Sequence, residues 1–306
     1  MRSGEYYSNG KFLLSGEYFV LYGAKALAVP LKYGQRMLVD ELPEPGILHW
    51  ETYVLNKLWF SAGFKLKDME IIESSNSKTA FFIQNLLKEG GKLQPGLYLT
   101  TKGYHIKNYI DFDINWGLGS SSSLVSNLAY WLDVDPYALY CSTFQGSGYD
   151  VFCARARRPI IYQLKENRPQ INETSFNPSF SDHLYFVYLG KKQDSQESVK
   201  NFKAQKGFDD HIILEISDLT DSMFKSVTVT DFLMAMHLHE EILSEFLRIP
   251  MVKEELFPDF HGEIKSLGAW GGDFVMAGTT MSAKEVKDYF FGKNLDVVFN
   301  WMEIVY

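Results

Sequence analysis

The segment NWGLGSSSSLVSNLAYWLD, from Asn115 to Asp133, places two glycines and four consecutive serines directly before an apolar run. The start of a helix exposes unpaired N–H groups and carries about half a positive charge. Glycines let the backbone close around a phosphate, because no Cβ blocks its approach. The pattern indicates an anion-binding helix start, to which Gly117, Gly119 and the serine hydroxyls add donors; the alternative is a plain serine N-cap after a turn.

The elements around this segment follow from hydrophobic periodicity. The first forty residues predict strands interrupted by glycine. Residues 76–88 switch to helical spacing, with one apolar stripe formed by Phe81, Phe82, Leu86 and Leu87. After the serines a second helix is predicted from apolar residues at three- and four-residue spacing, namely Leu124, Val125, Leu128, Trp131 and Leu132.

A polar segment divides the chain. KENRPQINETSFNPSFSD, from Lys165 to Asp182, carries two prolines and little periodicity, which indicates a domain boundary. Helices near 209–224 and 230–247 follow it, and a terminal strand closes the chain. Strands and helices are thus mixed in both halves, so the sequence predicts an α+β protein of two domains, residues 1–165 and 166–306.

The serine segment is one of three motifs that occur in a fixed order. NGKFLLSGEYFVLYGAKALAVPL precedes it and KSLGAWGGDFVMA follows it. Together the three resemble the motifs of the GHMP kinases, which include galactokinase, homoserine kinase, mevalonate kinase and phosphomevalonate kinase. QGSGYD, from Gln145 to Asp150, resembles the aspartate loop of the mevalonate and phosphomevalonate kinases. GGDF, from Gly271 to Phe274, resembles the end of the third motif in phosphomevalonate kinases.

The resemblance implies two domains, one ribosomal protein S5 domain 2-like and one ferredoxin-like, with ATP and a small-molecule substrate in the cleft between them. It implies catalytic roles for Lys11 and Asp150, and contact of Ser121 with Mg²⁺. The serine loop would wrap the ATP phosphates through Gly117, Leu118, Gly119, Ser120, Ser121, Ser122 and Ser123. The substrate would be bordered by Glu17, Gly148, Gly268, Gly271 and Gly272.

The residue types suit phosphoryl transfer, which depends on positioning and on charge stabilisation. Asp150 follows two glycines, so a tight turn would bring its carboxylate close to a substrate, where it can accept the proton of an alcohol. Lys11 can stabilise the ionised Asp150 and offset charge on the transferred group. The alternatives are a solvated strand-end lysine and a helix N-cap aspartate. Glu17 either orients Lys11 or the substrate, or is a turn carboxylate.

Three positions depart from the family pattern. Mevalonate and homoserine kinases hold Mg²⁺ with a glutamate before the aspartate loop, whereas Tyr137–Thr143 contains no carboxylate. Ser121, Asp150 and ATP would then have to suffice, since Mg²⁺ usually keeps several waters. Trp270 replaces a glycine of the third motif and either narrows the cleft or belongs to the core. Ile114-Asn115-Trp116 replaces a proline that often precedes the second motif.

Two other features receive weaker interpretations. HLHE, at His237–Glu240, is interpreted as ordinary helix surface, because residues two apart on a helix point about 200° from each other and cannot share a metal. Arg155, Arg157 and Arg158 would either face an anionic substrate or form salt bridges at a strand end. Cys141 and Cys153 are expected to be core thiols.

Composition limits the function further. The chain has 306 residues and a net charge of −8, which disfavours nucleic acid and anionic membranes as partners. Two cysteines without a zinc or disulfide spacing fit a reducing compartment, and no signal-peptide layout is present at the start. We therefore expect a cytoplasmic protein; the sequence does not indicate its oligomeric state.

The expected activity is ATP-dependent phosphorylation of mevalonate or phosphomevalonate. The alternatives are the related diphosphomevalonate decarboxylase, a sugar or homoserine kinase, and a nucleotide-binding regulator without catalysis. The absent glutamate favours the regulator, and the presence of both Lys11 and Asp150 argues against it.

Overall fold

The computed structural model describes residues 2–98, 102–192, 195–204, 207, 209–268, 270 and 273–306. Within these residues the strands form a large mixed sheet and a smaller antiparallel sheet, so the predicted α+β class is confirmed. The strand order of the larger sheet is β5-β4-β3-β6-β2-β7-β8, with β1 paired to β2. Its strands are β1 (Gly4–Ser15), β2 (Ala26–Leu42), β3 (Ile47–Val54), β4 (Lys57–Lys65), β5 (Ile71–Ser74), β6 (Gly103–Ile110), β7 (Ile160–Lys165) and β8 (Arg168–Glu173).

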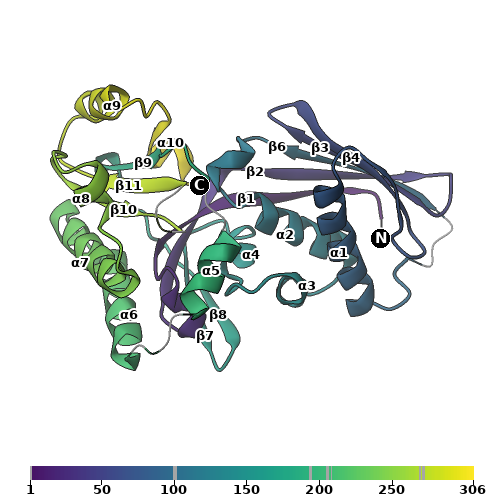
Figure 1. Cartoon of the computed structure of the whole chain (residues 1–306), viewed down its shortest axis with the longest axis horizontal. Coiled ribbons are helices and arrows are strands. Elements are labelled where there is room, and N and C mark those ends of the chain that lie inside the picture. The colour runs from purple at the N-terminus through teal and green to yellow at the C-terminus, as the bar shows by residue number, and fades with distance from the viewer. Residues whose placement is uncertain are drawn as a thin grey trace.

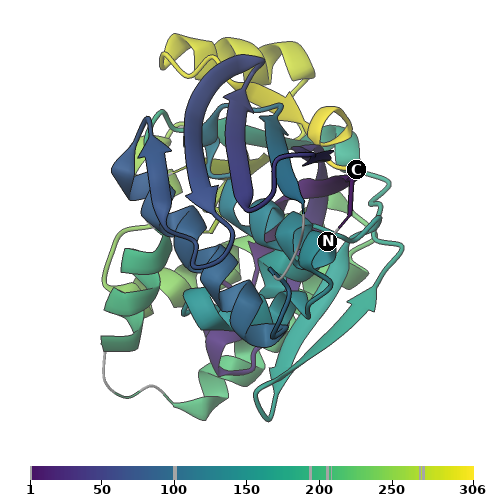
Figure 2. The same cartoon turned by 90° about the vertical axis from the view of Figure 1, so that its right-hand side faces the viewer.

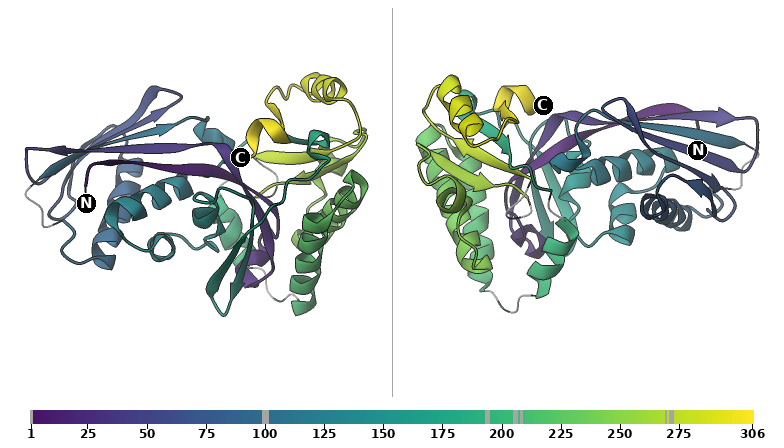
Figure 3. Two further views of the ribbon diagram at one scale, coloured as in Figure 1. Left: turned by 180° about the vertical axis from the view of Figure 1, so that it is seen from behind. Right: turned by 45° about the horizontal axis from the view of Figure 1, so that its top comes forward.

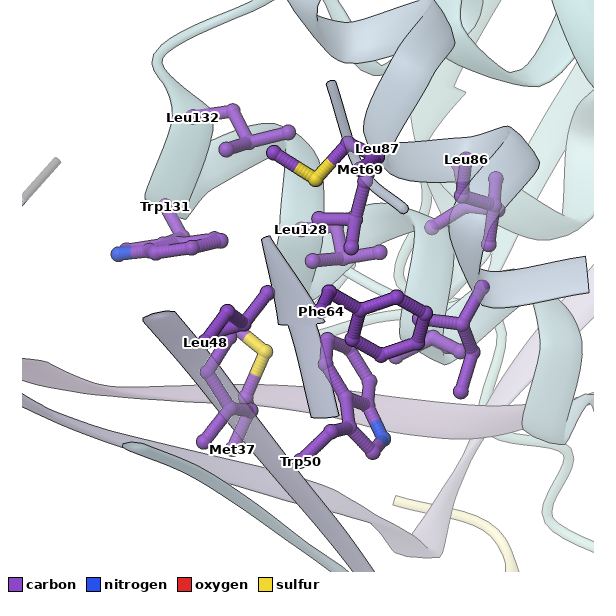
Figure 4. Close-up of a cluster of buried hydrophobic side chains, with 14 of the residues drawn as sticks. Met37, Leu48, Trp50, Phe64, Met69, Leu86, Leu87, Leu128, Trp131 and Leu132 are labelled. Carbon is purple, nitrogen blue, oxygen red and sulfur yellow. The ribbon is translucent and has the colours of Figure 1, made fainter. Parts of the chain in front are cut away.

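Helices cover one face of the larger sheet (Figures 1 and 2). They are α1 (Ser77–Leu93), α2 (Ser120–Leu132), α3 (Pro136–Thr143) and α4 (Tyr149–Cys153). Figure 4 shows Leu48, Trp50 and Phe64 of the sheet packed toward Leu128 of α2 and Leu87 of α1. This apolar layer holds the helices on the sheet, because burial of large apolar side chains is the main stabilising term in folding.

The predicted helix stripes agree with the structure in one case and differ in the other. All five predicted core residues of α2 are buried. In α1, Leu86 and Leu87 are buried, but Phe81 is 61% exposed. The predicted stripe was rotated, since Ala80 and Ile83 lie on the buried face with the two leucines. Phe81 lies outside that face because its position on the 3.6-residue repeat directs it to solvent.

The smaller sheet forms the second half of the molecule (Figure 1). Its strands are β9 (Leu184–Tyr188), β10 (Glu263–Ser266), β11 (Phe274–Gly278) and β12 (Val298–Asn300), in the order β10-β11-β9-β12. One face packs against α7 and the other against α8 and α9. The helices of this half are α6 (Asp210–Lys225), α7 (Val229–Leu247), α8 (Val252–Leu256), α9 (Ala283–Gly292) and α10 (Trp301–Ile304).

Two long strands and one short helix join the halves. β1 and β2 run side by side from the free end of the larger sheet to the second half (Figure 3). Helix α5 (Ser195–Ala204) lies between the halves (Figure 1).

β8 pairs with β7 across the expected domain boundary at residues 165 and 166. We propose that the boundary lies between β8 and β9, where the chain leaves the larger sheet.

Four ionisable side chains are buried where the halves meet. Glu17 follows β1, Lys265 belongs to β10, and His239 and Glu240 belong to α7; each is at most 2% exposed. The Lys265 ammonium donates to Glu17 Oε1. Glu240 Oε1 accepts the N–H of Ser266 at 3.1 Å. The interpretation of HLHE as helix surface is therefore wrong for His239 and Glu240.

The protonation states in this cluster follow from burial. Burial and the Lys265 ammonium hold the pKa of His239 well below its ordinary value, so its ring is neutral. His239 Nε2 then accepts the N–H of Gly16 at 2.9 Å. Burial also raises the pKa of Glu17, against the opposing effect of Lys265. For Glu240, burial is the larger effect and raises the pKa to about 7.

Glu240 should make the free energy of unfolding depend on pH. Between its ordinary pKa of 4.5 and about 7, the folded state keeps a proton that the unfolded state has released. Stability should therefore fall as pH rises through this window, by up to roughly 3 kcal/mol. Urea unfolding from pH 4 to 8 should show a flatter profile for Glu240→Gln than for the wild type.

Glu241→Gln is the matched control, because Glu241 is the exposed neighbour on the same helix. It should keep the wild-type profile. Equal slopes for Glu240→Gln and the wild type would contradict the burial of a neutral Glu240.

Candidate active site

A cavity of about 790 Å³ lies where the serine segment, the Asp150 loop, the residues after β1 and helix α5 meet. Lys11, Glu17, Ser121 and Asp150 all contribute to its lining, although they are distant in sequence. The structure therefore brings together the central residues of the first two motifs and the aspartate loop. From the third motif, Gly268 and Asp273 line the same cavity.

The glycines of the serine segment have defined structural roles. Gly117 and Gly119 adopt left-handed φ values of 68° and 93°, which glycine accepts without strain. A Cβ on Gly117 would overlap the Asp273 carboxylate, and a Cβ on Gly119 would approach Lys11 Cε to 3.2 Å. The carbonyl of Leu118 accepts the N–H of Lys11 at 2.9 Å. The loop is thus bonded directly to the strand that carries Lys11.

Helix α2 starts at this loop without a side-chain cap in the part of the chain that the structure describes. Its N-cap is Gly119, so the first N–H groups of α2 have no intrahelical partner and remain available to an anion. Ser120 is half-buried and Ser121 is exposed, and both line the cavity. The unpaired N–H groups of this helix start therefore lie beside the cavity.

The other predicted nucleotide-binding side chains differ in position. Ser122 lines the cavity, but its hydroxyl donates to the carbonyl of Gly119 at 2.9 Å. Ser123 is buried and donates to Gln35 Oε1 at 2.8 Å. The Leu118 side chain is buried in the core. Neither Ser123 nor Leu118 is among the described residues that line the cavity.

Lys11 and Asp150 line the cavity from two elements. Lys11 is half-buried on β1, with its ammonium 5.7 Å from the centre of the Tyr149 ring. Asp150 lies in the first turn of α4, and its Oδ1 accepts the N–H of Val151 at 3.1 Å. Burial raises the pKa of Asp150, and Lys11 opposes this rise. Among the described residues these two side chains form no direct ion pair, and the charge of Lys11 acts on Asp150 through space.

The residues predicted to border the substrate differ in whether they line the cavity. Glu17 lines the cavity, but its carboxylate is held by Lys265. Gly148 adopts a φ of 81° as the N-cap of α4 and is absent from the described cavity lining. Gly268 lines the cavity with a φ of 71°. Gly271 and Gly272 lie outside the described residues.

The two tryptophans that depart from the family pattern serve packing. Trp116 belongs to a short 3₁₀ helix, η2 (Ile114–Trp116), and packs against Phe274 and Phe299. Trp270 packs against the apolar cluster around Phe19, and its backbone N–H donates to the Tyr18 hydroxyl at 2.9 Å. Of the two alternatives for Trp270, the structure favours the core residue.

The arginines and one cysteine differ from expectation. Arg155 Nε donates to Ser126 Oγ at 3.0 Å, and its guanidinium stacks on Tyr130. Arg157 and Arg158 are exposed. None of the three is among the described residues that line the cavity, which does not support the alternative in which they face a substrate. The alternative of a strand-end salt bridge is not seen among the described ion pairs either. Cys153 is buried, as expected, whereas Cys141 is exposed.

The sequence and the structure were compared with those of known proteins. No protein-family model and no curated protein matches the sequence. The solved Methanococcus jannaschii mevalonate kinase matches with a TM-score of 0.70 at 20% identity, over 98% of each chain. Streptococcus pneumoniae phosphomevalonate kinase, in complex with phosphomevalonate and AMPPNP, gives 0.70 at 16% identity, over 97% of this chain and 99% of that chain.

A galactokinase from Lactococcus lactis, complexed with galactose, also matches, with a TM-score of 0.65 at 13% identity over 98% of this chain and 93% of that chain. The chain has the GHMP kinase fold. The resemblance that the three motifs carry is therefore confirmed at the level of architecture.

Within this GHMP kinase fold, helix α5 contributes residues that the sequence did not single out. Phe202 stacks on Tyr18 at 4.9 Å, and Lys203 Nζ donates to the carbonyl of Gln145 at 2.8 Å. These contacts hold α5 against the cavity, where its segment adds Lys192, Glu197, Ser198 and Lys200 to the lining. The sequence had not led us to predict a helix in this segment, and no local signal indicated that it would line the cavity.

Gly119→Val should raise the dissociation constant of ATP at least tenfold. A Cβ at this position meets Ser122 Oγ at 2.9 Å and the Lys11 side chain, and the φ of 93° disfavours a β-branched residue. Isothermal titration calorimetry on the folded variant measures the effect.

Gly46→Val is the matched control, since Gly46 has a φ of 80° and open space around its Cβ position. It should lose stability but keep the wild-type affinity for ATP. A folded Gly119→Val variant with unchanged affinity would contradict the assignment of the loop.

Proposed function

We propose that the protein is an ATP- and Mg²⁺-dependent small-molecule kinase that phosphorylates mevalonate or phosphomevalonate. The observation that carries this proposal is the meeting of Lys11, Asp150 and the uncapped start of α2 in one cavity. A phosphoryl-transfer enzyme needs these three parts, namely an anion-binding donor set, a cation and a base or orienting group. The resemblance of all three motifs supports the same activity.

The nucleotide would bind with its phosphates at the start of α2. The free N–H groups of the first turn and the Ser121 hydroxyl offer donors, and the helix dipole favours negative charge. The lysine ammonium of Lys11, on the adjacent strand, would offset charge on the transferred phosphoryl group.

Oxygen donors suited to Mg²⁺ are present despite the absent glutamate. Ser121 and Asp150 line the cavity, and so does Asp273, a buried residue whose carboxylate lies close to Gly117. Mg²⁺ prefers such oxygen ligands and, when bound, would neutralise phosphate charge. We therefore include Asp273 among its proposed ligands.

Asp150 would take the proton of an alcohol acceptor. Its raised pKa makes it a stronger base than an ordinary aspartate, provided that it is ionised. The rate should then rise with pH through the pKa of Asp150.

The acceptor is chosen between two compounds on chemical grounds. The three arginines do not line the cavity, and the lysines of the lining are Lys11, Lys192 and Lys200. A Lys11–Asp150 arrangement suits an alcohol, which favours mevalonate. A phosphate monoester is already largely dianionic at neutral pH and needs cations rather than a base. We also propose a cytoplasmic location, which two cysteines without a disulfide or zinc spacing favour. No described helix is long and apolar enough to cross a bilayer.

Asp150→Asn and Lys11→Ala should separate the two acceptors. With mevalonate, Asp150→Asn should lower kcat by about 10²–10⁴-fold and remove the acidic limb of the pH profile. With phosphomevalonate, Asp150→Asn should be mild and Lys11→Ala severe. Steady-state kinetics with both acceptors, together with ATP affinity, measure these effects.

The same assay distinguishes the proposed kinase activity from the alternative functions. Release of CO₂ would indicate the decarboxylase, and binding of ATP without turnover of any acceptor would indicate the regulator. Turnover of a sugar or homoserine, with neither mevalonate compound phosphorylated, would contradict both proposed acceptors and leave only the kinase activity.

Asp273→Asn should weaken the effect of Mg²⁺ on ATP binding. In the wild type, Mg²⁺ should tighten ATP binding relative to EDTA, because the metal links the carboxylate to the phosphates. In Asp273→Asn this gain should fall at least fivefold, while ATP binding in EDTA should be unchanged or tighter, since a negative charge is removed. Calorimetric titrations with and without Mg²⁺ measure both; an undiminished gain would contradict the role of Asp273.

A further inference from the structure

A group of polar side chains occupies the interface between α2 and the larger sheet. Ser8, Gln35, Ser123 and Asn127 are each at most 2% exposed. Apolar residues usually fill such an interface, and burial of polar groups is costly unless they are hydrogen-bonded. Four buried polar residues in one place therefore require an explanation beyond packing.

These side chains form one connected set of hydrogen bonds. Ser8 Oγ donates to Asn127 Oδ1 at 2.8 Å, and Asn127 Nδ2 donates to the backbone carbonyl of Gln35 at 2.9 Å. Ser123 Oγ donates to Gln35 Oε1 at 2.8 Å. Ser8 and Gln35 are directly opposed in the register of β1 and β2. Ser123 and Asn127 lie one turn apart on the same face of α2.

The set lies between two parts of the candidate active site without contacting the cavity. β1 continues from Ser8 to Lys11, which lines the cavity. Ser123 belongs to the first turn of α2, whose start offers the free N–H groups. Neither Gln35 nor Asn127 is among the described lining residues. The hydrogen bonds therefore connect the strand of Lys11 with the start of the anion-binding helix.

Hydrogen bonds differ from apolar contacts in being directional. An apolar interface of the same shape could be equally stable, but it would allow the helix to shift along the sheet. The bonds to Gln35 and Ser8 fix both the rotation and the axial position of α2. A buried polar network whose members are hydrogen-bonded rigidifies a core and specifies one arrangement of its elements.

We propose that Gln35, with Ser8, Ser123 and Asn127, is a positioning group that aligns the start of α2 with Lys11. The N–H groups of the helix and the Lys11 ammonium are thereby directed at the same phosphoryl group. The inference rests on the proposed function, because it assumes that this helix start binds ATP. It assigns Ser123 to positioning rather than to contact with the nucleotide.

The test uses Gln35→Met, Ser123→Ala and the double variant. Both single changes remove the Ser123–Gln35 hydrogen bond and should raise the ATP dissociation constant about fivefold, the equivalent of about 1 kcal/mol. Gln35→Met also removes the bond that Gln35 Nε2 donates to Asn108 Oδ1 at 3.4 Å, and Ser123→Ala removes the bond that Ser123 Oγ donates to the Ser120 carbonyl at 3.1 Å. The double variant should be no weaker than either single variant, since both act through one interaction. The value of kcat should fall as well, because Lys11 is misaligned. Calorimetry well below the unfolding temperature, with steady-state kinetics, measures these quantities.

Thr52→Val is the matched control. It removes another buried hydrogen bond of the same sheet, in which Trp50 Nε1 donates to Thr52 Oγ1 at 3.1 Å. It should lower the unfolding temperature to a similar extent and leave ATP affinity and kcat unchanged. If Gln35→Met does not fold, Ser123→Ala, which deletes one hydroxyl, decides the question.

The outcomes distinguish the inference from the proposed function. Wild-type affinity in folded Gln35→Met or Ser123→Ala would overturn the positioning role, as would an equal loss of affinity in Thr52→Val. Strictly additive effects in the double variant would also overturn it. Failure of the wild type to bind ATP at all would instead refute the proposed function.

Discussion

The buried ion pair between Glu17 and Lys265 links the two halves of the molecule beside the candidate active site. The two residues lie 248 positions apart in sequence, and both are almost completely buried. Removing two charges from water costs several kcal/mol per ion, and only close pairing offsets this cost. The ring of His239 is neutral, and the raised pKa of Glu240 favours its uncharged form, so both side chains keep the net charge around the ion pair low. The cavity wall that Glu17 forms is therefore fixed by a contact between the first motif and the first residue of the third.

Strand β1 organises the rest of the site. Ser8 bonds to α2, the backbone of Lys11 bonds to the loop before α2, and Glu17, just beyond the strand, bonds to the second half. One extended segment thus positions the helix start, the lysine and the opposing wall relative to one another. A rigid strand is suited to this task, because successive side chains alternate between its faces at fixed spacing.

Several features of this arrangement were predictable because their signals are local. The glycines before α2 and the apolar spacing after them specify a helix with a free start, and the structure has it. The order of three motifs predicted the fold. Predictions failed where a residue's environment depends on distant contacts: the sequence does not show that Ser123 would bond to Gln35, that His239 would be buried, or that Arg155 would stack on Tyr130.

The sequence by itself determined the element types, the flexible backbone at Gly117 and Gly119, and the residues able to bind phosphate or a proton. These depend on the chemistry of single residues and on short periodicities. Only the tertiary structure decided which of them share a cavity. The pairing of Glu17 with Lys265, the approach of Asp273 to Gly117 and the placement of α5 join segments far apart in the chain. Such contacts depend on how all the elements pack together, and no local sequence pattern determines that packing.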